Sequence, residues 1–229
     1  MKINYTQASN FLADFMLESR TNKIEKILNL RTRHITLVLE DIYHPQNASA
    51  IIRTAECFGI QDIHIIEKNK TYTPNTDIVR GASKWISFYK YNSNKIKINP
   101  TQQCINNLKS KGYSIATTTL HSKDTSLIGD IDISKPWAIC LGTEETGVSN
   151  TLINNADCLI KLPMYGFTES FNVSTAAALL LEIISTKLRL SNINWQLKEN
   201  EKEILRFEWY KKSVKNSNKL LDNFFHKNL

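Results

Sequence analysis

The apolar and polar residues of the chain follow two alternating patterns. Short, nearly continuous apolar runs predict strands at residues 35–40, 60–66, 85–89, 113–117, 136–142 and 158–164. Apolar residues at helical spacing predict helices at residues 47–58, 101–110, 148–156 and 173–188. Strands that alternate with helices are typical of an α/β fold, so we expect a parallel sheet with helices on both faces.

The two ends of the chain differ from this central pattern. Residues 1–30 place apolar side chains three and four positions apart and predict a helical N-terminal extension. Residues 191–229 lose the strand pattern and are basic, aromatic and helical in character. We therefore expect a sheet domain at residues 31–190, with a helical extension before it and a basic helical extension after it.

Composition and charge narrow the classes of function. Of the 229 residues, 41% are hydrophobic and 22% are charged, which is typical of a globular protein. The formal net charge of +7 is compatible with a polyanionic partner but does not require one. No apolar run approaches the ~18 residues of a membrane span, and the first twenty residues do not resemble a secretion signal. We therefore expect no membrane association and no export.

The cysteines and histidines give no sign of a disulfide framework or a zinc site. The four cysteines form no C-x-x-C pair, and the five histidines lack the spacing of metal ligands. This pattern favours reduced thiols and a cytoplasmic protein.

Common cofactor and hydrolase motifs are also missing. The chain has neither the G-x-G-x-x-G of dinucleotide-binding folds nor a P-loop, and it has no G-x-S-x-G elbow. An α/β protein without these motifs must bind any cofactor in another way.

Three polar segments follow predicted strands and are candidates for chemistry. In the first, Asn47 and Arg53 lie about 120° apart around a helix, and both could border one cleft. The second, residues 141–148, places Glu144 between two glycines, which permit close backbone approach and a positive-φ turn. The third, residues 162–174, offers Ser170, Asn172 and Ser174 before the most apolar helix. Each segment also has a purely structural interpretation, as a helix cap or as a strand-to-helix loop.

Taken together, the three segments resemble the motifs of the TrmH family, within the SPOUT superfamily of S-adenosylmethionine-dependent methyltransferases. The family's N-x-x-x-x-x-R motif corresponds to Asn47–Arg53, and its G-x-E-x-x-G motif corresponds to Gly142–Gly147. Its proline-containing loop leading to S-[LF]-N-V-S corresponds to Pro163 and Ser170–Ser174. The order and spacing of all three motifs make the resemblance specific, and it spans about residues 35–190.

The resemblance implies features that the residue pattern does not give. The C-terminal part of the sheet domain would be threaded into a deep trefoil knot, which is rare among proteins. The protein would be a homodimer in which each active site draws on both subunits. The cofactor would be S-adenosylmethionine in a bent conformation. Its expected contacts are Thr117, Leu141, Gly142, Leu162, Met164 and Phe171.

The C-terminal extension refines the expected substrate. Residues 197–210 resemble the tail of the tRNA guanosine 2′-O-methyltransferases, whose usual target is guanosine 18 of the tRNA D-loop. About 30 residues precede the first predicted strand, too few for the separate RNA-binding domain that related ribosomal RNA enzymes often carry. We therefore expect tRNA methylation, with no role for DNA. The alternatives are the same reaction on ribosomal RNA and a catalytically idle RNA-binding module.

The resemblance also implies roles for the motif residues. In the family, the arginine that corresponds to Arg53 is a proposed general base, aided by a substrate phosphate. Because a guanidinium stays protonated in proteins, we favour a role for Arg53 in gripping that phosphate and stabilising the forming alkoxide. Asn47 would position Arg53 or the ribose, and Glu144 would order its loop. Ser170 and Asn172 would line the site and hold the knot.

Basic residues outside these motifs are candidates for contacts with the RNA backbone. They are Arg20, Lys23, Arg80, Arg206, Lys211 and Lys212. We expect Trp209 and Tyr210 to accompany the C-terminal cations at this surface. A solvated helix face is the alternative for those in the two helical extensions, whereas Arg80 lies in the loop before Gly81 and has weaker support. Phosphate contacts would make RNA binding steeply dependent on salt.

Overall fold

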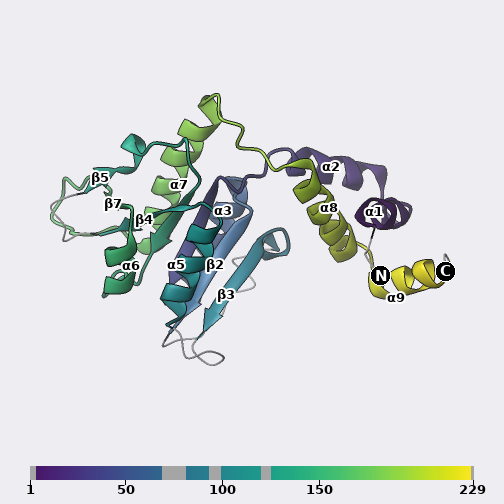
Figure 1. Ribbon diagram of the computed structural model, residues 1–229, viewed down its shortest axis with the longest axis horizontal. Coiled ribbons are helices and arrows are strands. Elements are labelled where there is room, and N and C mark those ends of the chain that lie inside the picture. The colour runs from purple at the N-terminus through teal and green to yellow at the C-terminus, as the bar shows by residue number, and fades with distance from the viewer. Residues whose placement is uncertain (1–3, 69–80, 93–98, 120–124, 228–229) are drawn as a thin grey trace. The chain divides into compact units, whose positions relative to one another are not determined.

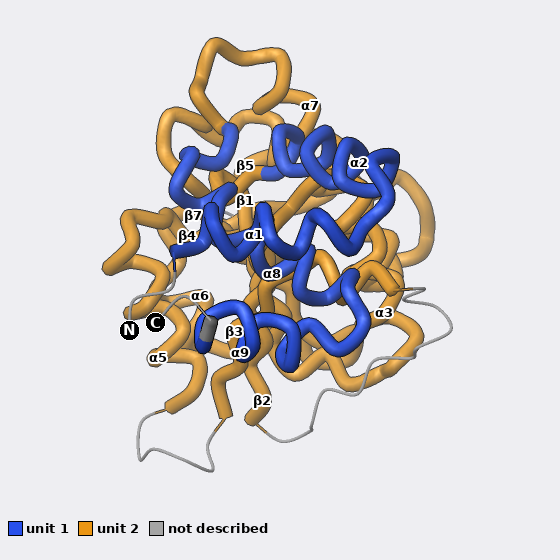
Figure 2. The backbone as a smooth tube through the Cα atoms, turned by 90° about the vertical axis from the view of Figure 1, so that its right-hand side faces the viewer, with its two compact units in different colours: residues 1–31, 196–229 blue, residues 32–195 orange. Residues whose placement is uncertain are grey.

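The chain folds into two compact units. The computed structural model describes residues 4–68, 81–92, 99–119 and 125–227. Residues 32–195 form a sheet unit, and residues 1–31 together with 196–229 form a helical unit (Figure 2). Residues from both ends of the chain therefore build one unit, and the sheet unit lies between them in the sequence.

The sheet unit contains a seven-stranded sheet in which every described strand pair is parallel. Along the chain, the strands are β1 (Ile35–Glu40), β2 (Asp62–Glu67), β3 (Ser87–Asn92), β4 (Ser114–Thr118), β5 (Ser126–Leu127), β6 (Trp137–Leu141) and β7 (Cys158–Lys161). In space, their order is β3-β2-β1-β6-β4-β7-β5. The predicted parallel sheet is confirmed. The prediction missed β5, whose two residues are too few to show a pattern.

The middle of the sheet is apolar on both faces, as its continuous apolar runs predict. Strands β1 and β6 are paired with each other and are buried along their whole length. Successive side chains of a strand point to opposite faces. Leu37 and Leu39 therefore join one core cluster, while Val38 joins the other.

Helices cover both faces of this sheet (Figure 1). On one face lie α3 (Pro45–Cys57) and α7 (Val173–Leu190), which contact each other. On the other face lie α5 (Pro100–Ser110) and α6 (Asn150–Asn155). Buried residues of α7 recur every three or four positions, which is the spacing of a stripe that faces a core. Short 3₁₀-helices precede β3 and follow β5, at Ala82–Lys84 and Ile128–Asp130.

The described part of the helical unit comprises α1 (Tyr5–Ala13), α2 (Glu18–Leu28), α8 (Glu199–Ser213) and α9 (Ser217–Lys227). Helices α1 and α2 both pack against α8, so the two ends of the chain share one core. In the part of the chain that the structure describes, no helix is both long enough and apolar enough to cross a bilayer.

The core of the helical unit is centred on Trp209, whose side chain is 1% exposed. The guanidinium carbon of the buried Arg31 lies 5.2 Å from the centre of the Trp209 ring, within the range of a cation–π contact. Tyr210 is also buried. The expectation that these two rings accompany RNA-binding cations at the surface is therefore wrong, because α8 turns them toward α1 and α2.

Candidate active site

The three candidate segments follow β1, β6 and β7, whose carboxyl ends lie at one edge of the parallel sheet. The first segment enters α3 at Pro45, with His44 at the N-cap position. Proline is favoured at the first position of a helix, and α3 begins two residues before the predicted start. Asn47 therefore lies in the first turn and does not cap the helix.

Asn47, Glu144 and Asn172 form a closed set of hydrogen bonds, which we call the polar triangle. The amide nitrogen of Asn47 donates to Glu144 Oε1 over 2.8 Å. The amide nitrogen of Asn172 donates to the same oxygen over 2.6 Å and to Asn47 Oδ1 over 3.1 Å. Glu144 and Asn172 are exposed, and Asn47 is half-buried. The triangle thus joins one residue from each segment and stays open to a ligand.

Asn172 has a second role as the N-cap of α7. Its Oδ1 accepts hydrogen bonds from the backbone nitrogen and the hydroxyl of Ser174, over 2.9 and 2.6 Å. The amide oxygen therefore fixes the start of the helix, while the amide nitrogen is directed to Glu144. The capping interpretation of this segment is confirmed, and the same side chain also joins the polar triangle.

The loop that carries Glu144 is a tight turn that requires glycine at two positions. Thr143 and Gly147 exchange backbone hydrogen bonds of 3.0 Å each. A Cβ on Gly142 would overlap the carbonyl group of Gly147, and Gly147 itself has a φ of +66°. Since the close contact at Gly142 and the positive φ at Gly147 both disfavour a side chain, another residue at either position would move the backbone. The turn holds Glu144 over the carboxyl end of β6.

A cavity of about 210 Å³ opens beside this turn, between the ends of β4, β6 and β7 and the loop before α7. Its lining includes these members of the predicted site: Leu141, Gly142, Glu144, Leu162, Met164, Ser170 and Phe171. The walls combine apolar side chains with hydroxyl and backbone groups, which is typical of a small-molecule site. Across the described ranges, no three His, Cys, Asp or Glu residues gather as metal ligands would.

The position of Thr117 differs from the prediction. Thr117 is fully buried and does not line the cavity, whereas Thr118 and Thr119 do. Strand β4 extends to Thr118, one residue beyond the predicted end, so the residues at its carboxyl end are shifted. The run of three threonines after apolar Ile115 and Ala116 was the sequence signal that could have located them.

Arg53 forms no hydrogen bond with the polar triangle. It is exposed on α3, six residues after Asn47, and it does not line the cavity of its own chain. Within the residues that the structure describes, no hydrogen bond or ion pair holds its guanidinium. Arg53 is therefore available to a ligand or to another molecule.

The predicted RNA contacts fall into different environments. Arg20 and Lys23 are exposed on α2, Lys212 is exposed on α8, and Lys211 is half-buried on α8. Arg80 lies outside the described residues. Arg20, Lys23, Lys211 and Lys212 are thus on helices of the helical unit with at least part of the side chain accessible.

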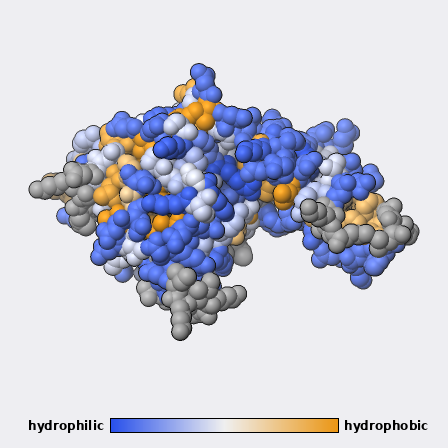
Figure 3. Space-filling view, in the orientation of Figure 1, coloured by the Kyte–Doolittle hydropathy of each residue, from blue (hydrophilic) through white to orange (hydrophobic). Residues whose placement is uncertain are grey.

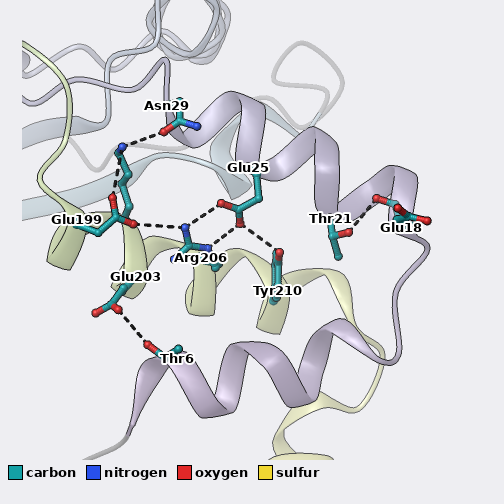
Figure 4. A network of polar contacts seen from close by, with 10 residues as sticks. Thr6, Glu18, Thr21, Glu25, Asn29, Glu199, Glu203, Arg206 and Tyr210 are labelled. Atoms are coloured by element: carbon teal, nitrogen blue, oxygen red, sulfur yellow. Dashed lines mark hydrogen bonds and ion pairs between the residues drawn. The ribbon is translucent and has the colours of Figure 1, made fainter.

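Arg206 is different, because it is bound inside the helical unit (Figure 4). Its Nε and Nη2 donate to the two carboxylate oxygens of Glu25 over 2.6 and 2.8 Å, and the Tyr210 hydroxyl donates to the same carboxylate over 3.2 Å. Partial burial raises the pKa of Glu25, but the hydrogen bonds and charge of Arg206 outweigh it and leave the pKa below its usual value. The expectation of an RNA contact at Arg206 conflicts with this pairing.

A family model matches residues 34–182, a range that contains the polar triangle, Arg53 and the cavity. The chain belongs to the SpoU rRNA Methylase family.

Individual proteins related to this SpoU family member share most of its length. The tRNA (guanosine(18)-2′-O)-methyltransferase of Borreliella burgdorferi is 44% identical over 205 residues, which are 90% of each chain. The protein of the same description from Escherichia coli (strain K12) is 29% identical over 81% of this chain and 76% of its own. Among solved structures, the A. aeolicus TrmH/SpoU tRNA modifying enzyme matches with a TM-score of 0.76 and 26% identity, covering 87% of this chain and 98% of that one.

Proposed function

We propose that this protein transfers a methyl group from S-adenosylmethionine to the ribose 2′-hydroxyl of guanosine 18 in tRNA. The observation that carries the proposal is the polar triangle of Asn47, Glu144 and Asn172 beside the cavity, with one residue from each family motif. The relatives from Borreliella burgdorferi and Escherichia coli support the substrate, since both are described as tRNA (guanosine(18)-2′-O)-methyltransferases.

The residues of the cavity fit S-adenosylmethionine. Leu141, Leu162 and Phe171 offer apolar surface for a flat ring, and the hydroxyls of Thr118 and Thr119 offer polar partners. When bound, S-adenosylmethionine supplies a methyl group on a sulfonium, whose neutral sulfide leaving group needs no acid. The protein is then left to orient the acceptor and to favour loss of its proton.

Arg53 serves the acceptor in this proposal. A ribose 2′-hydroxyl is a weak nucleophile and must pass its proton to the adjacent phosphate or to water as it attacks. The guanidinium of Arg53 would grip the adjacent phosphate with two parallel hydrogen bonds and stabilise the negative charge that forms on the oxygen. The polar triangle would hold the Glu144 loop and the start of α7 in place around the ribose. Ser170 would line the opening of the cavity.

We also propose that the protein is a homodimer in which Arg53 of each protomer completes its partner's site. The position of Arg53 outside the cavity of its own chain supports this arrangement. Large apolar side chains at the surface give further support, since Tyr165 is 96% exposed and Phe167 and Leu179 are also exposed. Figure 3 shows apolar surface on the side of the sheet unit where β4, β7 and α6 lie.

A trefoil knot and a cytoplasmic location belong to the same proposal. Strand β6 lies between β1 and β4, and β7 lies between β4 and β5, so late strands are inserted among earlier ones. This order supports the threading that the family resemblance implies. The tRNA substrate and the free cysteines favour the cytoplasm.

The helical unit would grip the tRNA backbone in this proposal, while the sheet unit performs the methyl transfer. Exposed Arg20, Lys23 and Lys212 support the assignment. This division keeps the three predicted parts of the chain but assigns both extensions to one RNA-binding function.

The test is a methyl-transfer assay with labelled S-adenosylmethionine and two tRNA transcripts, one with guanosine and one with adenosine at position 18. We expect label in the first transcript only, as 2′-O-methylguanosine in a nucleoside digest. A parallel reaction with ribosomal RNA tests the ribosomal alternative, which label there and in neither tRNA transcript would favour. RNA binding without any methyl transfer would favour the catalytically idle RNA-binding module.

A further inference from the structure

The carboxylate of Glu40 is a buried centre of hydrogen bonds close to the site. Glu40 is the last residue of β1 and is 3% exposed. Its Oε1 accepts from the hydroxyls of Thr101 and Ser149 over 2.6 and 2.8 Å, and its Oε2 accepts from the backbone nitrogen of Ser149 over 2.7 Å. The ammonium of Lys68 forms an ion pair with the same group. One carboxylate thus joins β1 to the ends of three other segments.

These partners keep the buried carboxylate charged. Burial raises the pKa of Glu40, but the hydrogen bonds from Lys68, Thr101 and Ser149 outweigh it and hold the pKa below its usual value. A buried charge of this kind is tolerated only when its lone pairs are satisfied. The geometry around Glu40 is therefore strongly specified, and its partners cannot drift independently.

The positions of Glu40 and Ser149 in the chain connect this centre to the polar triangle. Ser149 ends the segment that begins at Gly142 and carries Glu144. Glu40 begins the segment that leads to Asn47. The same two segments are therefore joined twice, once by the exposed bond between Asn47 and Glu144 and once by the buried bonds between Glu40 and Ser149.

We propose that Glu40 is a positioning residue, which holds the 142–149 segment through Ser149 and so sets the wall of the cofactor cavity and the place of Glu144. This inference rests on the proposed function. Glu40 does not line the cavity, so its effect passes through Ser149. Its bond to Thr101 leads to α5 instead and serves the fold.

Two hydroxyls that donate to the same carboxylate oxygen provide a matched test. Ser149→Ala removes the hydroxyl donor on the cavity side and leaves the backbone donor of residue 149, and Thr101→Val removes the hydroxyl donor on the α5 side with little change of shape. Both variants lose one hydrogen bond to a charged group, so similar losses of stability are expected from both. If Glu40 positions the segment, Ser149→Ala weakens S-adenosylmethionine binding about tenfold in calorimetry, while Thr101→Val stays within twofold of wild type.

The full-length protein also allows a kinetic check in the tRNA assay. We expect Ser149→Ala to raise the KM for S-adenosylmethionine by a similar factor, and Ser149→Thr, which restores a hydroxyl, to recover most of it. Equal effects of Ser149→Ala and Thr101→Val on cofactor binding would overturn the role of Glu40. Wild-type protein that binds no S-adenosylmethionine would overturn the proposed function instead, so the two failures are distinguishable.

Discussion

Two arginines on helices, Arg206 in the helical unit and Arg53 in the sheet unit, occupy opposite environments. Arg206 donates two hydrogen bonds to Glu25, and its Nη2 lies 3.7 Å from a carboxylate oxygen of Glu199. Arg53 is exposed, and no described residue holds its guanidinium. Within a single chain, one arginine therefore joins helices, while the other has no partner among the described residues.

The difference shows how function can be separated from structure among charged residues. A paired arginine keeps its geometry and has few donors left for a ligand. An arginine without a partner keeps all five N–H donors available, and its guanidinium adds nothing to the stability of the fold. Replacing Arg53 should therefore change activity without changing stability, whereas replacing Arg206 should do the reverse.

The largest expected effect is at Arg53. Arg53→Ala should lower the rate of tRNA methylation roughly 10²–10³-fold, because a donor to developing negative charge is lost. The free energy of unfolding should change by less than about 0.5 kcal/mol, as expected for an exposed residue. Steady-state kinetics and urea unfolding measure the two quantities, and Lys135→Ala is a matched control for loss of one exposed cation.

Arg53→Lys sharpens this test, since lysine keeps the charge and loses the planar fork. We expect activity between those of wild type and Arg53→Ala. A wild-type rate for the lysine variant would contradict the role in phosphate binding and alkoxide stabilisation.

Acid should affect the two units in different pH ranges. Burial, with help from the charge of Lys111, lowers the pKa of His64 in the sheet unit to about 4. Below its ordinary pKa of 6.5, the histidine binds a proton in the unfolded chain but stays neutral in the folded protein until the pH approaches 4. Stability is therefore lost as the pH falls from about 6.5 to 4, by about 3 kcal/mol in total.

Protonation of Glu25 in the helical unit affects stability at a lower pH than protonation of His64. Its folded pKa lies below the usual value of 4.5, so its contribution is present above that pH and is lost only at lower pH. Urea unfolding at pH 7.0, 5.5, 4.5 and 3.5 covers both pH ranges. His64→Gln should flatten the dependence of the free energy of unfolding on pH between about 6.5 and 4. If the slope in that variant equals that of wild type, another group is responsible.

A smaller effect is expected at Arg206. Arg206→Ala should lower the free energy of unfolding by about 1–2 kcal/mol, between the values for exposed ion pairs and for buried charged hydrogen bonds. A double-mutant cycle with Glu25→Ala isolates the pair. Reduced tRNA affinity without any change in stability would restore the sequence-based interpretation of Arg206 as an RNA contact.

The smallest effect is expected at Lys212, which is exposed on the same helix. Lys212→Ala should weaken tRNA binding only a few-fold and reduce the slope of log affinity against log salt by about one. Filter binding at several salt concentrations measures both. An unchanged slope would place Lys212 on a solvated helix face.

The sequence pattern could predict the sheet because burial acts on whole strands. Strand β1 is apolar over nearly its full length, and its observed bounds match the predicted ones. Asn47, Glu144 and Asn172 follow different strands, and the carboxyl ends of parallel strands share one edge of a sheet. Their grouping could therefore be expected, although their hydrogen bonds could not.

What the pattern could not give are pairings across long stretches of chain. The partner of Arg206 is Glu25, 181 residues away, and no local signal marks a glutamate as its ligand. Trp209 looked like a surface ring because its neighbours are basic, but tertiary packing decides which side of an amphipathic helix is covered. Glu40 carries no motif at all, and only the buried donors around it reveal its importance.

The helical unit also has a consequence for the order of synthesis. Helices α1 and α2 leave the ribosome first, yet their partner α8 is made only after the entire sheet unit. Helices α1 and α2 must therefore wait for this partner until α8 has been translated. We expect a nascent chain halted before α8 to contain a folded sheet while its first thirty residues remain open to proteases and chaperones.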